Sequence, residues 1–162
     1  MRISTKNISL YVVVALFILI IAFIFSNSLK NGEESNAQSQ PIVEAIEALL
    51  DPNDKIPTTT FNYIVRKAAH ITEFTALGMT LAGYVWCINR STMKRTAAYK
   101  QRIAAAGGIG LLAAIADEII QIFTGRTSSF SDVLIDFFGV VFGMAIVLTV
   151  CRWLENHAKK SL

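Results

Sequence analysis

The chain has 162 residues, of which 53% are hydrophobic, with a mean hydropathy of +0.48 and a net charge of +3. Its apolar residues are gathered into long runs, which excludes the composition of an ordinary soluble domain. The positive charge does not indicate a nucleic-acid partner, because the basic residues lie beside these runs. Length and composition predict a single membrane domain over residues 1–162.

Four apolar segments follow one another, at residues 8–25, 64–88, 103–123 and 133–151. Each approaches the roughly 20 apolar residues that a helix needs to cross a bilayer. Arg2 and Lys6 resemble the start of a signal peptide, but the apolar run after them exceeds the usual length of about 7–15 residues and no A-x-A-like site follows it. We therefore predict an all-α bundle of four transmembrane helices, with the first helix retained.

The connection at residues 26–62 is predicted to lie outside the bilayer. Residues 31–40 are polar, with Gly, Ser, Asn and Gln, which is typical of a flexible linker. Residues 41–50 place Ile42, Ile46, Leu49 and Leu50 on one helical face. That pattern fits a short helix lying on the outer leaflet, capping a pocket or simply exposed at the surface. Pro52 and Pro57 then break the chain.

The distribution of charge over the connections predicts the orientation, because Lys and Arg accumulate in cytoplasmic loops. The basic residues gather in both tails and in the connection between the second and third segments: Arg2, Lys6, Arg90, Lys94, Arg95, Lys100, Arg102, Arg152, Lys159 and Lys160. Acidic residues instead dominate the connection at residues 26–62. We predict that both termini face the cytoplasm and that this acidic connection lies outside.

Ten polar residues then fall in the outer half of the membrane: Arg66, Lys67, His70, Glu73, Asp117, Glu118, Gln121, Arg126, Asp132 and Asp136. A charge near mid-bilayer costs on the order of 2.5–3.5 kcal/mol by insertion scales, so such groups persist when they are paired, hydrated or functional. Helical spacing places Arg66, His70 and Glu73 on one face. We predict a polar pocket that opens toward the outer leaflet.

Small residues predict close contacts between the helices. Gly139 and Gly143 continue the face of Asp136 as a G-x-x-x-G pair, which allows another helix to approach closely. Gly78 and Ala82 form a similar stripe in the second segment, and Gly107, Gly108 and Gly110 form a less regular one in the third. The two cysteines, Cys87 and Cys151, lie at segment ends without metal-ligand spacing, and we expect them to be structural.

The ten polar residues allow four kinds of chemistry. His70 and Glu73, facing Asp117 and Glu118, could serve as an acid–base set. Together with Asp136, these four residues also offer nitrogen and oxygen ligands for a metal ion. Helix-bundle metal sites use a doubled Glu/His motif, whereas H-x-x-E occurs only once here, and no metal site is assigned. Arg66, Lys67 and Arg126 could hold a phosphate or carboxylate. The fourth alternative is an ion-pair network that only fixes the register of the helices.

The remaining polar residues have supporting roles in this interpretation. We expect Gln121 and Asp136 to orient a ligand. Asp132 is expected to cap the fourth helix or to pair with Arg126.

These residues resemble the signatures of the VanZ-like family. Residues 66–74, RKAAHITEF, followed by Leu77 and Gly78, resemble the first signature, and residues 117–121, DEIIQ, with Arg126, Asp132, Asp136, Gly139 and Gly143, resemble the second. Asp136 stands where the family often has Asn. The resemblance implies a small multi-pass protein of the bacterial cytoplasmic membrane. Its name-giving member is associated with resistance to the lipoglycopeptide teicoplanin, and the resemblance supplies no reaction.

Taken together, these features predict a cell-envelope protein whose pocket binds an envelope lipid, a lipid-linked headgroup or a lipoglycopeptide antibiotic. The alternative is an intramembrane hydrolase or transferase, dependent on a metal or on acid–base groups, that acts on a lipid. No cofactor is assigned, and a homo-oligomer is compatible with the sequence.

Overall fold

The computed structural model describes residues 5–51, 53, 55–89, 97–126 and 128–158. This part of the chain contains five helices and no strand: α1 (Thr5–Ser28), α2 (Gly32–Leu50), α3 (Thr58–Asn89), α4 (Ala97–Phe123) and α5 (Phe130–Ala158). The predicted all-α fold is confirmed. Several residues used in the sequence analysis lie outside the described part: Arg2, Pro52, Arg90, Lys94, Arg95, Lys159 and Lys160.

Four of the helices, all except α2, are long and apolar enough to cross a membrane, as predicted. Their apolar side chains point outward as well as inward. Tyr11, Leu19, Leu112 and Phe138, for example, are all more than half exposed. Outward apolar groups of this kind suit a lipid environment, where polar surface would be costly. The chain is therefore a multi-pass membrane protein.

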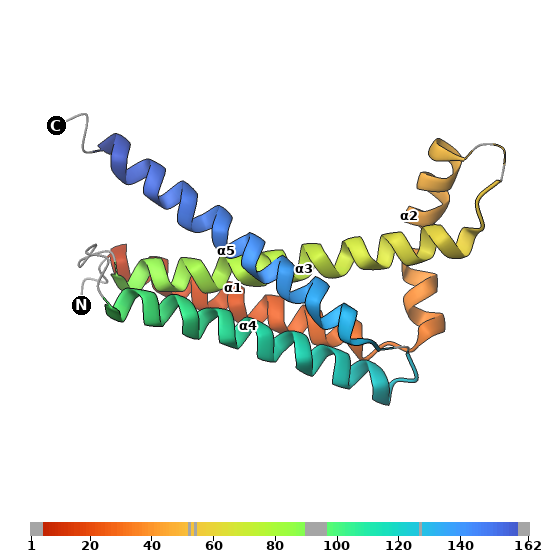
Figure 1. Cartoon of the computed structure of the whole chain (residues 1–162), viewed down its shortest axis with the longest axis horizontal. Coiled ribbons are helices and arrows are strands. Elements are labelled where there is room, and N and C mark those ends of the chain that lie inside the picture. The colour runs from red at the N-terminus through yellow and green to blue at the C-terminus, as the bar shows by residue number, and fades with distance from the viewer. Residues whose placement is uncertain (1–4, 52, 54, 90–96, 127, 159–162) are drawn as a thin grey trace.

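The closest packing joins α3 and α5, which cross near the middle of α3 (Figure 1). A Cβ added at Gly78 would lie 2.1 Å from the carbonyl oxygen of Val140, and one added at Gly143 would lie 2.0 Å from that of Thr75. Gly139 similarly faces the backbone of Ile71 at 2.9 Å. The contacts predicted for Gly78, Gly139 and Gly143 are thus confirmed, because only glycine lets the two backbones approach so closely. Gly110 faces the Val140 side chain, but nothing lies within 4 Å of a Cβ added at Gly107 or Gly108, so the contacts predicted for these two residues are wrong.

The segment at residues 31–40 is helical, so its prediction as a flexible linker is wrong. Asn31 caps α2: its side-chain oxygen accepts from the Glu34 N–H at 2.9 Å, and the Glu34 carboxylate accepts from the Asn31 N–H at 3.1 Å. This reciprocal capping box starts a helix that continues through Pro41. The polar composition of the segment did not indicate a helix, although α2 packs against α3.

The inward face of α2 also differs from the predicted one. Val43 is fully buried and packs with Phe61 and Val65 of α3, with Ile46 beside them, whereas Leu49 and Ile42 are more than half exposed. The Thr58 hydroxyl donates to the Glu47 carboxylate at 2.7 Å, which joins the start of α3 to the end of α2. α2 lines a pocket with Ser35, Gln38, Ser39 and Ile42, so of residues 41–50 only Ile42 takes part in the predicted capping.

Both ends of the described chain lie at one end of the bundle, and α2 lies across the other end, beside the connection from α4 to α5 (Figure 1). The crossing of α3 and α5 separates these two ends. The core between them is apolar and includes Phe74, Leu77, Ala114 and Val140, all fully buried. The predicted polar residues gather at the end that carries α2.

The close crossing of α3 and α5 predicts that Gly143→Ala destabilises the protein by about 1–3 kcal/mol, the usual cost of overpacking. Thermal unfolding in detergent measures this loss. Gly108→Ala is the matched control, because nothing lies within 4 Å of the Cβ that it adds. Equal melting temperatures for the two variants would contradict the crossing.

Candidate functional site

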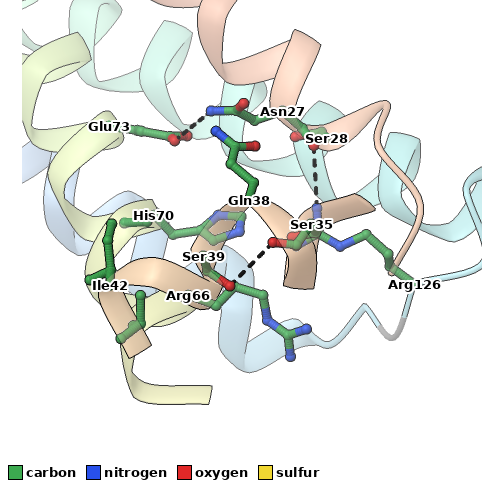
Figure 2. A pocket seen from close by; sticks show the side chains of 12 residues that line it. Asn27, Ser28, Ser35, Gln38, Ser39, Ile42, Arg66, His70, Glu73 and Arg126 are labelled. Atoms are coloured by element: carbon green, nitrogen blue, oxygen red, sulfur yellow. Dashed lines mark hydrogen bonds between the residues drawn. The ribbon is translucent and has the colours of Figure 1, made fainter. Parts of the chain in front are cut away.

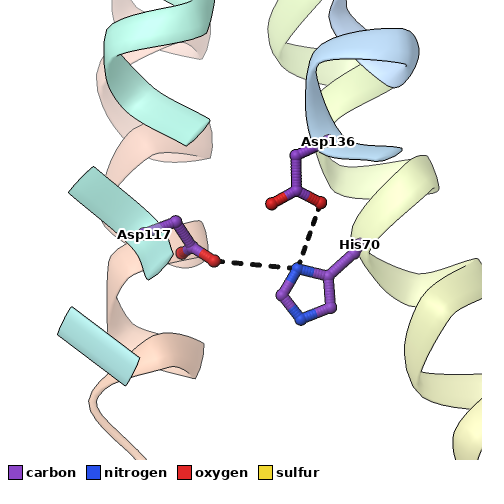
Figure 3. Close-up of side chains that lie close together, drawn as sticks. All are labelled: His70, Asp117 and Asp136. Carbon is purple, nitrogen blue, oxygen red and sulfur yellow. Dashed lines mark ion pairs between the residues drawn. The ribbon is translucent and has the colours of Figure 1, made fainter. Parts of the chain in front are cut away.

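Three ionisable side chains from three helices meet at the polar end of the bundle (Figure 3). His70 of α3 directs its Nδ1 atom toward Asp136 Oδ1 of α5 at 3.4 Å and toward Asp117 Oδ2 of α4 at 3.7 Å. Asp117 and Asp136 are 0% and 1% exposed. We refer to these three residues as the His–Asp–Asp cluster.

Asp117 is held by polar groups on two sides. One carboxylate oxygen accepts a hydrogen bond from the Ser28 hydroxyl at the end of α1, and the other accepts from the Gln121 amide at 2.7 Å, one turn along α4. The Thr124 hydroxyl donates to the Ser28 carbonyl oxygen at 3.2 Å. The carboxyl end of α1 is therefore fixed against the end of α4, and the orientation of Asp117 is set before any ligand arrives.

Asp136 has a different environment. Neither of its carboxylate oxygens has a hydrogen-bond partner among the described residues, although both are buried. A buried carboxylate is costly unless a cation or hydrogen-bond donors compensate it. Its one ion-pair partner in the described part is His70, which also lies close to Asp117.

A cavity of about 150 Å³ lies beside the cluster, between α1, α2, α3 and the connection after α4 (Figure 2). Polar side chains from all four of these parts of the chain line it: Asn27, Ser28, Ser35, Gln38, Ser39, Arg66, His70, Glu73 and Arg126. Glu73 accepts a hydrogen bond from the Asn27 amide at 2.8 Å. The predicted common face of Arg66, His70 and Glu73 is thus the wall that α3 contributes.

Arg126 reaches the cavity from a tight turn. Gly125 has a φ of +72°, a conformation that favours glycine, and the Arg126 N–H donates to the Gln121 carbonyl oxygen at 3.0 Å. One terminal nitrogen of its guanidinium donates to the Asn27 carbonyl oxygen at 3.5 Å, and the buried Nε has no hydrogen-bond partner among the described residues. Burial, reinforced by the nearby Arg66, lowers the pKa of Arg126.

Glu118 and Gln121 are buried behind the cavity and do not line it. The Glu118 carboxylate accepts from the Ser128 hydroxyl at 2.6 Å and from the Ser129 N–H at 3.3 Å. It therefore holds the connection between α4 and α5. Gln121 contacts Asp117, so its position supports an orienting role and does not place it against a ligand.

Lys67 and Asp132 form an ion pair with each other, away from the cavity. The Lys67 ammonium also lies 5.4 Å from the centre of the Tyr63 ring. Among the described residues Asp132 pairs with Lys67 and not with Arg126, whereas its expected role as a cap of the fourth helix stays a prediction. Because α5 begins at Phe130, Asp132 lies in its first turn, where a negative charge suits the helix dipole.

Sequence reasoning missed the polar residues that α1 and α2 contribute. Asn27 and Ser28 end a strongly apolar helix, which was the available signal. Ser35, Gln38 and Ser39 are spaced i, i+3 and i+4, which places them on one helical face, but the prediction of a linker for this segment left that spacing unused.

The arrangement offers two guanidinium groups, one carboxylate and one imidazole around a single small cavity. It can bind an anion, exchange a proton at His70 or Glu73, or hold a cation at the His–Asp–Asp cluster. Residues 13–152 match the protein-family model described as VanZ/LLP1, and this range covers most of the chain, with α2, α3 and α4 in full and most of α1 and α5. No curated protein and no solved structure matches the chain.

Proposed function

The chain belongs to the VanZ/LLP1 family, and we propose that it binds the anionic headgroup of an envelope lipid or lipid-linked precursor in the cavity between α1, α2 and α3. The observation that carries the proposal is the pair of arginines on one cavity, with the Arg126 Nε buried and without a hydrogen-bond partner among the described residues. A phosphate or carboxylate would supply the missing acceptor, and a guanidinium can bind it through two parallel hydrogen bonds.

The other side chains around the cavity suit a headgroup that also carries hydrogen-bond donors. Glu73 is an acceptor, and Gln38, Ser35 and Ser39 of α2 offer polar atoms on the opposite wall. Sugar hydroxyls or an ammonium group beside a phosphate would match this mixture of charges. A lipid-linked glycan and an aminated phospholipid both have such headgroups.

The size of the cavity favours a lipid headgroup over an antibiotic. About 150 Å³ accommodates a phosphate with part of its substituent, whereas sites that enclose drug-sized ligands measure roughly 300–1,000 Å³. A lipoglycopeptide would therefore place only one group inside. Antibiotic binding becomes a secondary expectation, to be measured beside lipid binding.

The length of α3 supports a cavity near the membrane surface. Its 32 residues span about 48 Å at about 1.5 Å per residue, whereas the hydrocarbon core is about 30 Å thick. Roughly a dozen residues of α3 thus extend into the headgroup region or beyond it. If the excess lies at the amino end, beside α2, Arg66 reaches the depth of lipid phosphates.

A second candidate function is hydrolysis or group transfer on the bound headgroup. It is favoured by one observation: His70 and Glu73 line the same cavity as the two arginines. A base and an acid beside a bound phosphate could activate water and protonate a leaving group. His70→Gln and Glu73→Gln would then abolish release of product from a lipid phosphate, whereas a protein that only binds shows no such release in any variant.

Arg126→Ala is expected to weaken binding of a polyprenyl phosphate by roughly tenfold to a hundredfold, because hydrogen bonds to charged groups contribute about 1.5–3 kcal/mol. Titration of the purified protein in nanodiscs measures this, with phosphatidylethanolamine and teicoplanin as the alternative ligands. Arg66→Ala should act in the same direction.

Lys67→Ala is the control for net charge, because Lys67 neighbours Arg66 but pairs with Asp132 outside the cavity. Its affinity should stay within about twofold of the unmodified protein. A loss as large as that of Arg126→Ala would show that bulk positive charge, and not the cavity, attracts the lipid.

The proposed orientation, with α2 outside and both termini inside, predicts how engineered cysteines react. In a background that lacks Cys87 and Cys151, Gln38→Cys on intact cells should react with a membrane-impermeant maleimide, and Lys100→Cys should react only after lysis. The reasoning rests on the positive-inside rule. Labelling of Lys100→Cys alone on intact cells would reverse the orientation and overturn binding from the outer leaflet.

A further inference from the structure

We propose that the His–Asp–Asp cluster binds a divalent transition-metal ion of the Zn²⁺ class at the inner wall of the cavity. The ligands would be His70 Nδ1, one oxygen of Asp117 and one oxygen of Asp136. This inference rests on the cluster alone and does not require that the cavity bind a lipid. It also differs from the sequence analysis, which considered five ligands and assigned no metal.

The separations of the three atoms suit a shared ion. At metal–ligand distances of about 2.0–2.2 Å, the ligand atoms of a tetrahedral site lie about 3.3–3.6 Å apart. The imidazole Nδ1 lies 3.4 Å from Asp136 Oδ1 and 3.7 Å from Asp117 Oδ2. Ligand atoms of all three residues lie within 4.8 Å of one another. Small side-chain rotations would complete the geometry.

The hydrogen bonding of the cluster is incomplete without a cation. A protonated His70 has a single Nδ1 proton to offer two carboxylates. Asp117 has other donors in Ser28 and Gln121, but Asp136 has none among the described residues and is 99% buried. A divalent ion would bond both carboxylates and the neutral imidazole at once. It would therefore offset the cost of burying Asp136.

Hydrogen bonds already occupy the two other nearby carboxylates, which makes Asp117 and Asp136 the better candidates for metal ligands beside His70. Glu73 is engaged by Asn27, and Glu118 by Ser128 and the Ser129 N–H. The hydrogen bonds from Ser28 and Gln121 fix the orientation of the Asp117 carboxylate, as outer hydrogen bonds do for many metal ligands. Imidazole and carboxylate ligands suit Zn²⁺ and Mn²⁺, whereas Mg²⁺ prefers an all-oxygen environment.

Of the three proposed ligands, His70 alone lines the cavity, so a further ligand would reach the ion from that side. His70 lines the cavity, and three protein ligands with an open fourth position distinguish reactive zinc sites from structural ones. A water molecule or a headgroup oxygen from the cavity could occupy that position. The ion would then add a third positive centre to those of Arg66 and Arg126.

The test measures the metal directly. The full chain with Cys87→Ala and Cys151→Ala, purified in detergent and stripped by a chelator, is dialysed against Zn²⁺, and bound zinc is measured by mass spectrometry. We expect one zinc per chain, reduced at least tenfold in Asp136→Asn and in His70→Gln. Asp132→Asn, the same substitution one turn earlier on α5, is the matched control and should keep the full stoichiometry.

Thermal unfolding provides a second readout that does not depend on any one variant being well folded. Zn²⁺ should raise the melting temperature of the unmodified protein and of Asp132→Asn, because a ligand that binds only the folded state stabilises it. It should leave that of Asp136→Asn unchanged. X-ray absorption should show nitrogen and oxygen ligands with one imidazole.

Two results would overturn the proposal. One is zinc binding by the unmodified protein no greater than that of a His70→Gln, Asp136→Asn double variant. The other is stoichiometric zinc that Asp136→Asn does not reduce, which would place the ion elsewhere. The readouts are metal content and stability, so neither result decides whether the cavity binds a lipid. That proposal is tested separately by Arg126→Ala.

Discussion

The close approach of α3 and α5 is the constraint on which the site depends. Short Asp and His side chains meet only if their backbones lie near each other, and Gly78, Gly139 and Gly143 provide that proximity. Asp136 lies one turn before Gly139 on α5, so the crossing brings its carboxylate to His70 on α3. The close crossing of α3 and α5 therefore determines the geometry of the polar end.

The groups without partners at the polar end argue against a network that only fixes the register of the helices. In such a network each buried polar group would be expected to have a hydrogen-bond partner, because a buried polar group without a partner costs about 1–3 kcal/mol. Asp136 and the Arg126 Nε remain without hydrogen-bond partners among the described residues, and a cavity lies beside them. Asp136 lacks a hydrogen-bond donor and the Arg126 Nε lacks an acceptor, which is the pattern expected of a site that binds ligands.

The sequence predicted the features that follow from periodicity and charge. Four apolar runs predicted the four membrane helices, and the glycine spacing predicted close helix contacts, which the structure places between α3 and α5. The face of Arg66, His70 and Glu73 followed from helical spacing alone. The helix at residues 31–40 was missed because its capping box lies in a polar segment, and its packing depends on Val43 meeting Phe61, a contact between distant parts of the chain. The pairing of Lys67 with Asp132 was missed for the same reason: spacing places residues on a face, and tertiary packing chooses their partners.

Native mass spectrometry of the full chain, released from its membrane in a mild detergent, tests most directly whether this end of the bundle is a ligand site. We predict that about one anionic lipid per chain stays bound after bulk lipid is removed, enriched in a lipid phosphate or lipid-linked glycan over its share of the membrane. Retention only of phospholipids in the proportions of the surrounding membrane would contradict the proposed site.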